Sequence, residues 1–305
     1  MNETSTGRGS GKFIIFGEHA VVYGRPALAS SLSRGAMASL RRVESPRWTA
    51  AHPAGAIDAD DQVARAVKAL LATFDLHPEQ LEIDVELTIP VGAGLGSSAA
   101  MAVALARAAA GLCGFDGERA KNMVDRAVAA SEAVFHGNAS GIDQRAASGA
   151  GFFRFQRQGE SPTFESFEVP AQRWIVAQVA PSQSTAEMVA AVASLYERRH
   201  QLVDRIFDDI AVITESGRQA LCAGRWDEVG ELMNLNQGLL NALGVSSPRL
   251  EAACQAARDA GAFGAKLTGA GGGGCIIALG GPGDAVESSL TEFGPVYTFD
   301  LPSKS

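Results

Sequence analysis

The sequence has no apolar run that approaches the roughly 20 residues needed to cross a bilayer. We therefore expect no membrane span. The opening residues, MNETSTGRGSG, are polar, carry one arginine and lack the apolar stretch of a secretory signal peptide. Together these two absences predict a cytoplasmic protein.

Cysteine is scarce and is not arranged for metal binding. The four cysteines lie far apart and form no CxxC pair, which argues against a zinc site and against a disulfide framework. We expect them to be packing residues; they are Cys113, Cys222, Cys254 and Cys275.

Positive charge is also in short supply. The chain has 26 Lys and Arg against 34 Asp and Glu, a net charge of -8. No basic block with interleaved aromatic residues stands out, so the sequence predicts no nucleic-acid partner.

The hydrophobic residues that are present, 46% of the chain, are enough for a full core, and their spacing predicts an α+β fold. Alternating segments indicate strands, and segments with apolar residues three and four apart indicate helices. The expected strands cover 12–16, 28–32, 81–89, 151–155, 164–169, 174–179, 265–268, 275–279 and 296–299. The expected helices cover 60–75, 99–110, 117–135, 186–222, 226–243, 248–260 and 284–293. Ser247 is the candidate N-cap of the helix at 248–260, with Pro248 at its first position.

Expected strands dominate the middle of the chain, whereas long expected helices follow Pro181. This change predicts two domains, 1–170 and 171–305, that flank one cleft.

The strongest chemical signal is GAGLGSS at 92–98, between an expected strand and an expected helix. Glycines let backbone N–H groups approach an anion, and a helix N-terminus adds positive potential, so phosphate is the natural ligand. The loop is not a Walker A motif, and Ser97 breaks the dinucleotide-binding pattern. A glycine turn that only packs strand against helix is the alternative. Ser98 could ligate Mg²⁺ or cap the helix, and the two roles could be divided between Ser97 and Ser98.

A second glycine run, GAGGGG at 269–274, lies between two expected strands. Each glycine costs folding entropy, so a run this dense is more than ordinary packing requires. A flexible linker is the alternative, but linkers do not usually lie between buried strands. We therefore expect this run to be functional.

Three separated motifs resemble those of the GHMP kinases, the family of galactokinase, homoserine kinase, mevalonate kinase and phosphomevalonate kinase. They are Lys12 with GEHAVVYG at 17–24, IPVGAGLGSSAA at 89–100 and KLTGAGGGGC at 266–275, in the family's order. Within the family, the first motif and EAVFHGNASGID at 132–143 are most similar to those of members that phosphorylate mevalonate.

The resemblance implies a GHMP kinase fold of two domains. The N-terminal domain would be an α/β domain like the second domain of ribosomal protein S5 and would bind ATP. The C-terminal domain would be a ferredoxin-like α+β domain. The implied activity is a Mg²⁺-dependent transfer of the terminal phosphate of ATP to the 5-hydroxyl of mevalonate, in isoprenoid synthesis. The partner would be a small molecule, and a homodimer is a family expectation.

The resemblance also implies roles for individual residues. The ATP phosphates would lie against the first glycine loop, at Gly92, Gly94, Leu95, Gly96, Ser97 and Ser98. Ser98 and Glu132 would be Mg²⁺ ligands. Asp143 would lie beside the acceptor hydroxyl as its base, with Lys12 near both. The remaining substrate contacts would be Glu18, His19, Thr185 and Gly271.

Each of these residues also has a plain structural interpretation. Asp143 could be a turn or helix-cap aspartate, and Glu132 a solvated helix residue. Lys12 could be a charge at a strand edge, and Thr185 could be the N-cap of the following helix. Glu18 could be a surface acid, and His19 a hydrogen-bonded turn histidine. Val91 and Ala139 depart from the family, which often has proline at those positions.

The alternatives to this activity are two. A sibling kinase would share the phosphate-binding residues and differ only in its acceptor. A non-catalytic ATP-binding regulator would keep the glycine loop without the chemistry, but the joint presence of Lys12, Ser98, Glu132 and Asp143 argues against it.

Overall fold

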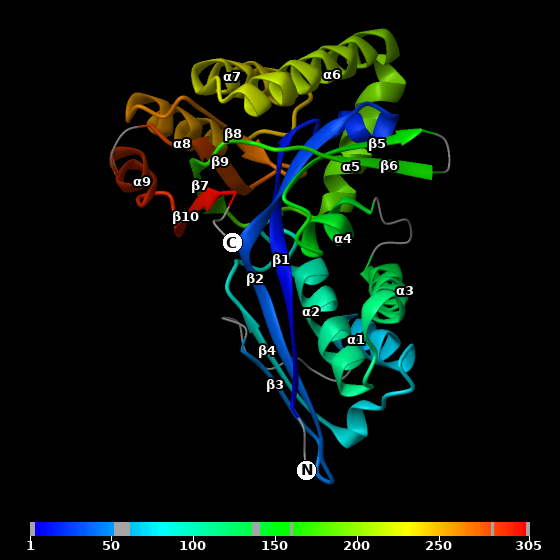
Figure 1. Cartoon of the computed structure of the whole chain (residues 1–305). Coiled ribbons are helices and arrows are strands. Elements are labelled where there is room, and N and C mark those ends of the chain that lie inside the picture. Colours follow the sequence, from blue (N-terminus) through cyan, green and yellow to red (C-terminus); the bar gives the residue numbers. More distant parts are fainter. Residues whose placement is uncertain (1–3, 52–61, 136–140, 159–160, 282–283, 303–305) are drawn as a thin grey trace. The chain divides into compact units, whose positions relative to one another are not determined.

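The structure, a computed structural model, describes residues 4–51, 62–135, 141–158, 161–281 and 284–302 (Figure 1). The chain folds into two compact units that interleave along the sequence. The first unit holds residues 1–11, 34–90 and 96–149, and the second holds 12–33, 91–95 and 150–305. Strands β1 (Ser5–Phe16) and β2 (Ala27–Arg42) each pass from one unit into the other.

The first unit combines antiparallel and parallel strands with helices. The second half of β2 pairs antiparallel with β4 (Leu81–Leu87), and β3 (Arg47–Ala51) pairs parallel with β4. Leu81, Ile83 and Val85 of β4 are buried and the residues between them are not, as expected for a strand with one face on a core. The helices are α1 (Gln62–Ala72), α2 (Ser97–Leu112), α3 (Gly117–Phe135) and α4 (Ile142–Ala147), and the first three pack on one another (Figure 1).

Helix α2 is built almost entirely of small residues, which lets strand β1 approach it closely. A Cβ at Gly9 would lie 2.0 Å from the carbonyl oxygen of Ala100, and a Cβ at Gly7 would lie 2.1 Å from that of Ala104. Backbone therefore lies against backbone here, and the helix that begins at Ser97 is fixed against β1.

The second unit contains a four-stranded antiparallel sheet in the order β10-β7-β9-β8. Its strands are β7 (Gln172–Ala180), β8 (Gly264–Thr268), β9 (Gly274–Leu279) and β10 (Val296–Leu301). Along the chain, helices separate β7 from β8 and β9 from β10, so the unit has the β-α-β-β-α-β connection of ferredoxin-like folds. Strands β5 (Phe152–Gln158) and β6 (Ser161–Ser166) form a hairpin, and β5 also pairs with the first half of β2.

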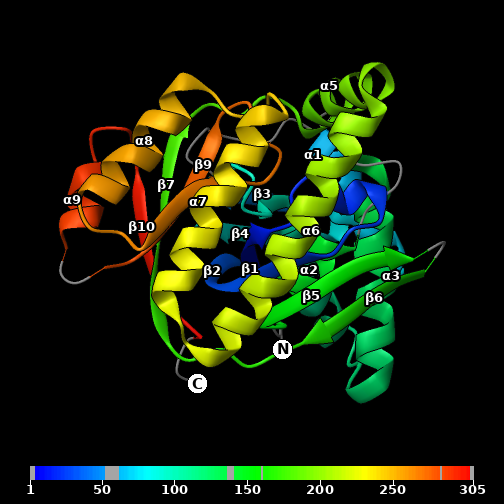
Figure 2. The ribbon, with the colours of Figure 1, turned by 90° about the horizontal axis from the view of Figure 1, so that it is seen from above.

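Helices of the second unit supply most of its apolar core. They are α5 (Thr185–Arg198), α6 (His200–Ala223), α7 (Trp226–Ala242), α8 (Pro248–Asp259) and α9 (Ala285–Leu290). Ile175, Ala177 and Val179 of β7 alternate into one cluster with residues of all five helices. Figure 2 shows α6 and α7 side by side, as their contacts require. Elsewhere in this unit, the ring of Trp174 packs at a tilt against the rings of Phe13 and Phe152.

Several expectations from the sequence need correction. The single helix expected over 186–222 is two helices, because the chain turns out of helical geometry at Arg199 (φ -139°, ψ 42°). Strand β3 and helix α4 were not expected, and the polar residues 5–11 belong to strand β1. The cap at Ser247 is confirmed: its hydroxyl accepts a hydrogen bond from the N–H of Leu250 at 3.4 Å.

The four cysteines are free thiols in the described structure; Cys113 is half-buried, with its Sγ 3.9 Å from the carbonyl oxygen of Phe74. Cys254 and Cys275 are buried, and burial raises the pKa of each thiol to about 12. Cys222, by contrast, is exposed. Across the described ranges, no helix combines the length and the apolar character that a membrane crossing requires.

Candidate active site

The first motif forms a tight turn between β1 and a short 3-10 helix, η1 (Ala20–Tyr23). His19 has φ 61° and ψ -46°, and the N–H of Ala20 donates to the carbonyl of Glu18 at 2.7 Å. This is a γ-turn of the positive-φ form, which is rare and strained for a residue with a side chain. The turn persists only if its surroundings hold it.

Glu18 is held by a buried ion pair. Its carboxylate accepts a hydrogen bond from Nζ of Lys266, and both side chains are excluded from solvent, at 1% and 0% exposure. The same Nζ donates to the carbonyl of Leu267 at 2.6 Å, and Nδ2 of Asn236 donates to the other carboxylate oxygen at 3.3 Å. Burial lowers the pKa of Lys266, while the neighbouring Glu18 carboxylate acts in the opposite direction.

His19 is held by the second glycine run. Its Nε2 lies 2.9 Å from the carbonyl oxygen of Ala270, and the side chain is 5% exposed. A carbonyl can only accept, so Nε2 is the nitrogen that carries hydrogen. Burial lowers the pKa of His19, although this hydrogen bond and the charge of Glu18 oppose the shift.

Two alternate side chains of strand β8 reach the segment that carries the first motif. Lys266 bonds Glu18, and the hydroxyl of Thr268 bonds the backbone of Ile14. Two residues beyond the strand, the backbone carbonyl of Ala270 accepts from His19. The intervening residue Leu267 packs into the helical core of the unit. Because side chains alternate along a strand, one face of β8 carries the core and the other carries the first motif.

Helix α7 closes the outer edge of β8, which is the last strand in the sheet order. Oδ1 of Asn234 accepts from the N–H of Ala265 at 3.2 Å, and Oε1 of Gln237 accepts from the N–H of Leu267 at 2.8 Å. Gly230 lets the helix come this close, since a Cβ there would lie 2.1 Å from the carbonyl oxygen of Phe263. These amides were not predicted from the sequence; their signal is the cluster of three amide side chains, Asn234, Asn236 and Gln237, in the middle of the helix.

The second glycine run follows β8 and packs closely against other segments of the second unit. Gly271, a predicted substrate contact, has φ 79°, and a Cβ on it would lie 2.1 Å from the carbonyl oxygen of Val245. Cβ atoms on Gly272 and Gly273 would meet Sδ of Met188 at 2.5 Å and the carbonyl oxygen of Pro181 at 2.1 Å. Close packing therefore explains part of this run, and the predicted substrate contact of Gly271 stays a prediction.

The first glycine loop carries left-handed glycines at every second position. Gly92, Gly94 and Gly96 have φ 67°, 79° and 72°. Gly96 is the N-cap of α2 and makes no side-chain cap bond, so the first N–H groups of that helix keep their capacity to bind an anion. A Cβ on Gly92 would meet nothing within 4 Å, so packing within the described structure does not require glycine there.

The remaining predicted site residues divide between the two units. Ser98, Glu132 and Asp143 belong to the first unit, on α2, α3 and α4, and both α3 and α4 pack on α2. Ser97 and Ser98 are half-buried at the start of α2, Glu132 is 4% exposed, and Asp143 lies in the first turn of α4. The interpretation of Glu132 as a solvated helix residue is therefore wrong.

Lys12, Leu95 and Thr185 belong to the second unit. The N–H of Lys12 donates to the carbonyl of Leu95 at 2.9 Å, which ties the first motif to the glycine loop, and the Lys12 side chain is 7% exposed. Thr185 is exposed at the first position of α5, where Ser184 is the N-cap and forms a capping box with Glu187. The alternative of Thr185 as N-cap is therefore wrong. Ala139, one of the departures from the family pattern, lies outside the described residues.

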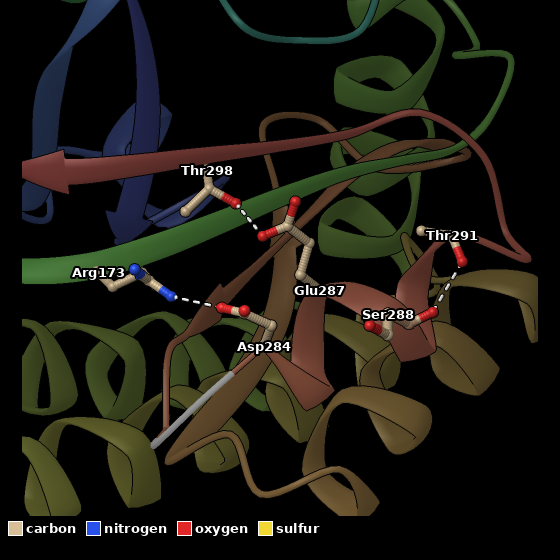
Figure 3. A pocket seen from close by; sticks show the side chains of 6 residues that line it. All are labelled: Arg173, Asp284, Glu287, Ser288, Thr291 and Thr298. Atoms are coloured by element: carbon tan, nitrogen blue, oxygen red, sulfur yellow. Dashed lines mark hydrogen bonds and ion pairs between the residues drawn. The ribbon is translucent and has the colours of Figure 1, made fainter.

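A separate pocket of about 340 Å³ lies in the second unit, near β10 and α9 (Figure 3). Four of its polar side chains are already paired with one another: Arg173 with Asp284 at 3.0 Å and Thr298 with Glu287 at 2.9 Å. None of the predicted site residues lines it. In the ranges that the structure describes, no group of three or more His, Cys, Asp or Glu side chains is arranged to hold a metal ion.

Two family models match separate segments of this chain. The model for the GHMP kinase N-terminal domain matches residues 61–151, and the model for the GHMP kinase C-terminal domain matches residues 218–296. The chain belongs to the GHMP kinase family. The predicted family, the α+β class and the two-domain GHMP kinase fold are confirmed.

Proteins similar to this chain in sequence include mevalonate kinases. The one from Pyrococcus abyssi is 36% identical over 294 residues, covering 88% of this chain and 86% of that protein. The one from Archaeoglobus fulgidus is 38% identical over 273 residues, covering 88% and 90%. Among solved structures, L. major mevalonate kinase in complex with R-mevalonate matches with a TM-score of 0.87 and 27% identity, over 99% of this chain and 98% of that chain.

Proposed function

We propose that this chain transfers the terminal phosphate of ATP to the 5-hydroxyl of (R)-mevalonate, which gives 5-phosphomevalonate and ADP for isoprenoid biosynthesis. The observation that carries the proposal is the full-length match to proteins named mevalonate kinase, one of them solved with R-mevalonate bound. Family membership supplies ATP as the phosphate donor.

The ATP phosphates bind the first glycine loop in this proposal. The left-handed glycines at 92, 94 and 96 aim backbone N–H groups at an anion, and the N-terminus of α2 adds its positive end. Leu95, buried at 1% exposure, anchors the loop between these glycines, while Ser97 and Ser98 follow at the first helical turn.

Ser98 and Glu132 would hold Mg²⁺. A hydroxyl and a carboxylate are the hard oxygen donors that Mg²⁺ prefers, and two protein ligands suffice because water and phosphate oxygens complete its shell. When bound, Mg²⁺ neutralises charge on the β- and γ-phosphate oxygens. The buried position of Glu132 on α3, which packs against α2, supports this pairing.

Asp143 and Lys12 act on the acceptor hydroxyl. As the hydroxyl oxygen forms its bond to the γ-phosphorus, its proton passes to the carboxylate of Asp143. The bond from the γ-phosphorus to the bridging oxygen breaks, and ADP leaves with the electron pair. The ammonium of Lys12 stabilises the developing negative charge on the attacking oxygen.

Four further residues complete the proposed acceptor site: Glu18, His19, Thr185 and Gly271. The homodimer, the cytoplasmic location and the boundary between 1–170 and 171–305 stay predictions. Each follows from the sequence or from the resemblance to the family.

ADP production with mevalonate, phosphomevalonate, galactose and homoserine offered separately tests the proposed function. We expect mevalonate to be phosphorylated far faster than the others. Preference for another acceptor would reject the substrate and keep the kinase activity. ATP binding without acceptor-dependent turnover of any of them would reject the enzyme.

A further inference from the structure

The turn at His19 holds a strained backbone next to two buried charges. Its γ-turn geometry places His19 at φ 61°, in the region that favours glycine. A strained residue keeps its conformation only where contacts with neighbouring groups hold it, and such residues concentrate at binding sites. The groups that hold this turn are therefore candidates for a role in function.

We propose that Lys266 is a positioning residue for the acceptor site: its buried ion pair with Glu18 holds the γ-turn at His19, and the turn presents the imidazole to the acceptor in one orientation. The inference rests on the proposed function for the identity of the acceptor. It assigns a positioning role, not phosphate binding, to the first residue of the third motif, KLTGAGGGGC at 266–275.

The contacts place Lys266 where it can act in this way. Residue 18 is fixed twice, since its carbonyl accepts the hydrogen bond that closes the γ-turn and its carboxylate accepts from Lys266. Lys266 is in turn fixed by the carbonyl of Leu267 and by its strand, whose outer edge is closed by α7. Its complete burial leaves the ammonium no access to solvent. Charge pairing therefore couples the turn rigidly to β8.

The same geometry selects one tautomer of His19. The carbonyl of Ala270 accepts a hydrogen bond, so Nε2 carries the hydrogen. In the neutral ring Nδ1 is then a hydrogen-bond acceptor, which suits a hydroxyl of the acceptor molecule. If the turn relaxed, the imidazole would lose Ala270 and both tautomers would be populated.

The variant that tests the proposal removes both buried charges together, Glu18→Gln with Lys266→Met. Losing one partner alone would leave an unpaired buried charge, whereas replacing both is often tolerated. Arg173→Met is the control, because it removes an ion pair to Asp284 in the same unit, and in the described structure neither Arg173 nor Asp284 bonds the first or third motif.

The first readout is nitrogen-15 NMR of the His19 imidazole at a pH where the ring is neutral, assigned with His19→Gln. We expect the Nε2-protonated tautomer in the wild type and in Arg173→Met, and a mixture of tautomers in the double variant. An Nδ1-protonated ring in the wild type would overturn the proposal without any variant. This readout needs no turnover, so it stands even if mevalonate proves not to be the acceptor.

The second readout is the Michaelis constant for each substrate. In the double variant the KM for mevalonate should rise at least about tenfold, because the proposed contact of Glu18 and the orientation of His19 are lost together, while the KM for ATP stays within about twofold. The positioning role of Lys266 would be rejected if the double variant folds and keeps both the tautomer and the mevalonate KM of the wild type. Equal increases in both KM values would mean that the pair is only structural.

Discussion

The hydroxyl of Thr268 bonds both backbone groups of Ile14: it accepts from the N–H at 2.9 Å and donates to the carbonyl at 2.9 Å. A side chain on β8 thus takes the place of a neighbouring strand for one residue of β1. Thr268 is 2% exposed, so water does not reach this site readily.

Thr268→Val keeps the shape of the side chain and leaves two backbone groups of Ile14 unsatisfied. We expect a loss of about 1–3 kcal/mol in the free energy of unfolding, measured by urea denaturation. Thr163→Val is the control, since the Thr163 hydroxyl bonds Gln156 at an exposed position. Equal effects of the two substitutions would contradict the structural role of Thr268.

Gly92→Ala tests the phosphate loop against a matched glycine. Gly92 and Gly114 have φ 67° and 68°, and a Cβ on either would meet nothing within 4 Å. The backbone cost is therefore the same, about 1–2 kcal/mol for a residue with a Cβ in this conformation. Only at Gly92 would the Cβ crowd a bound phosphate. We expect the KM for ATP to rise at least about tenfold in Gly92→Ala alone, whereas a similar rise in Gly114→Ala would favour a purely conformational role.

Glu132→Gln tests the metal site. The substitution keeps size and removes charge, so the concentration of Mg²⁺ needed for half-maximal activity should rise, and excess Mg²⁺ should recover part of the rate. Glu118→Gln, at the exposed start of the same helix, is the control. An unchanged Mg²⁺ requirement in Glu132→Gln would remove Glu132 from the site.

Asp143→Asn and Lys12→Met test the chemical step. We expect Asp143→Asn to lower kcat by on the order of 10² or more, with little change in the affinity for ATP. Because both groups act on one hydroxyl, the double variant should lose less than the product of the single losses. Asp116→Asn, exposed in the loop after α2, serves as the control for Asp143. Full activity in Asp143→Asn would reject the mechanism.

The buried imidazole of His19 predicts how stability depends on pH. Burial lowers the pKa of His19 below its ordinary value of 6.5, so near and below that pH the unfolded chain binds the proton more readily than the folded one. The contribution of His19 to stability is therefore present above pH 6.5 and is lost as the pH falls toward the folded pKa. Unfolding free energies of the wild type and His19→Gln between pH 5 and 8 should differ in slope in this direction. Parallel curves would show that His19 titrates alike in both states.

Much of the fold is local in origin and was predicted from the sequence. The helix expected over 117–135 has those bounds in the structure, and the cap at Ser247 marks the start of α8. Such elements are specified by nearest neighbours, because periodicity and capping act within a few residues. The order of the three motifs was likewise enough to identify the family.

What the sequence could not reveal depends on residues far apart in the chain. Lys266 and Glu18 are 248 positions apart, and neither is surrounded by any pattern that marks it as half of a buried pair. Residues 5–11 looked like a polar start because glycine and serine are poor strand formers, yet their close approach to α2 needs glycine at 7 and 9. The break at Arg199 has no glycine or proline to announce it.

The amides of Asn234 and Gln237 also bear on whether this protein aggregates while it folds. Strand β8 is buried along its whole length, and its outer N–H groups would attract a strand from another chain if they were uncovered. Because α7 precedes β8 in the chain, the two amides are synthesised before the strand edge that they cover. We expect replacement of both amides with leucine to leave the N–H groups of Ala265 and Leu267 without these partners and therefore more open to intermolecular β-pairing.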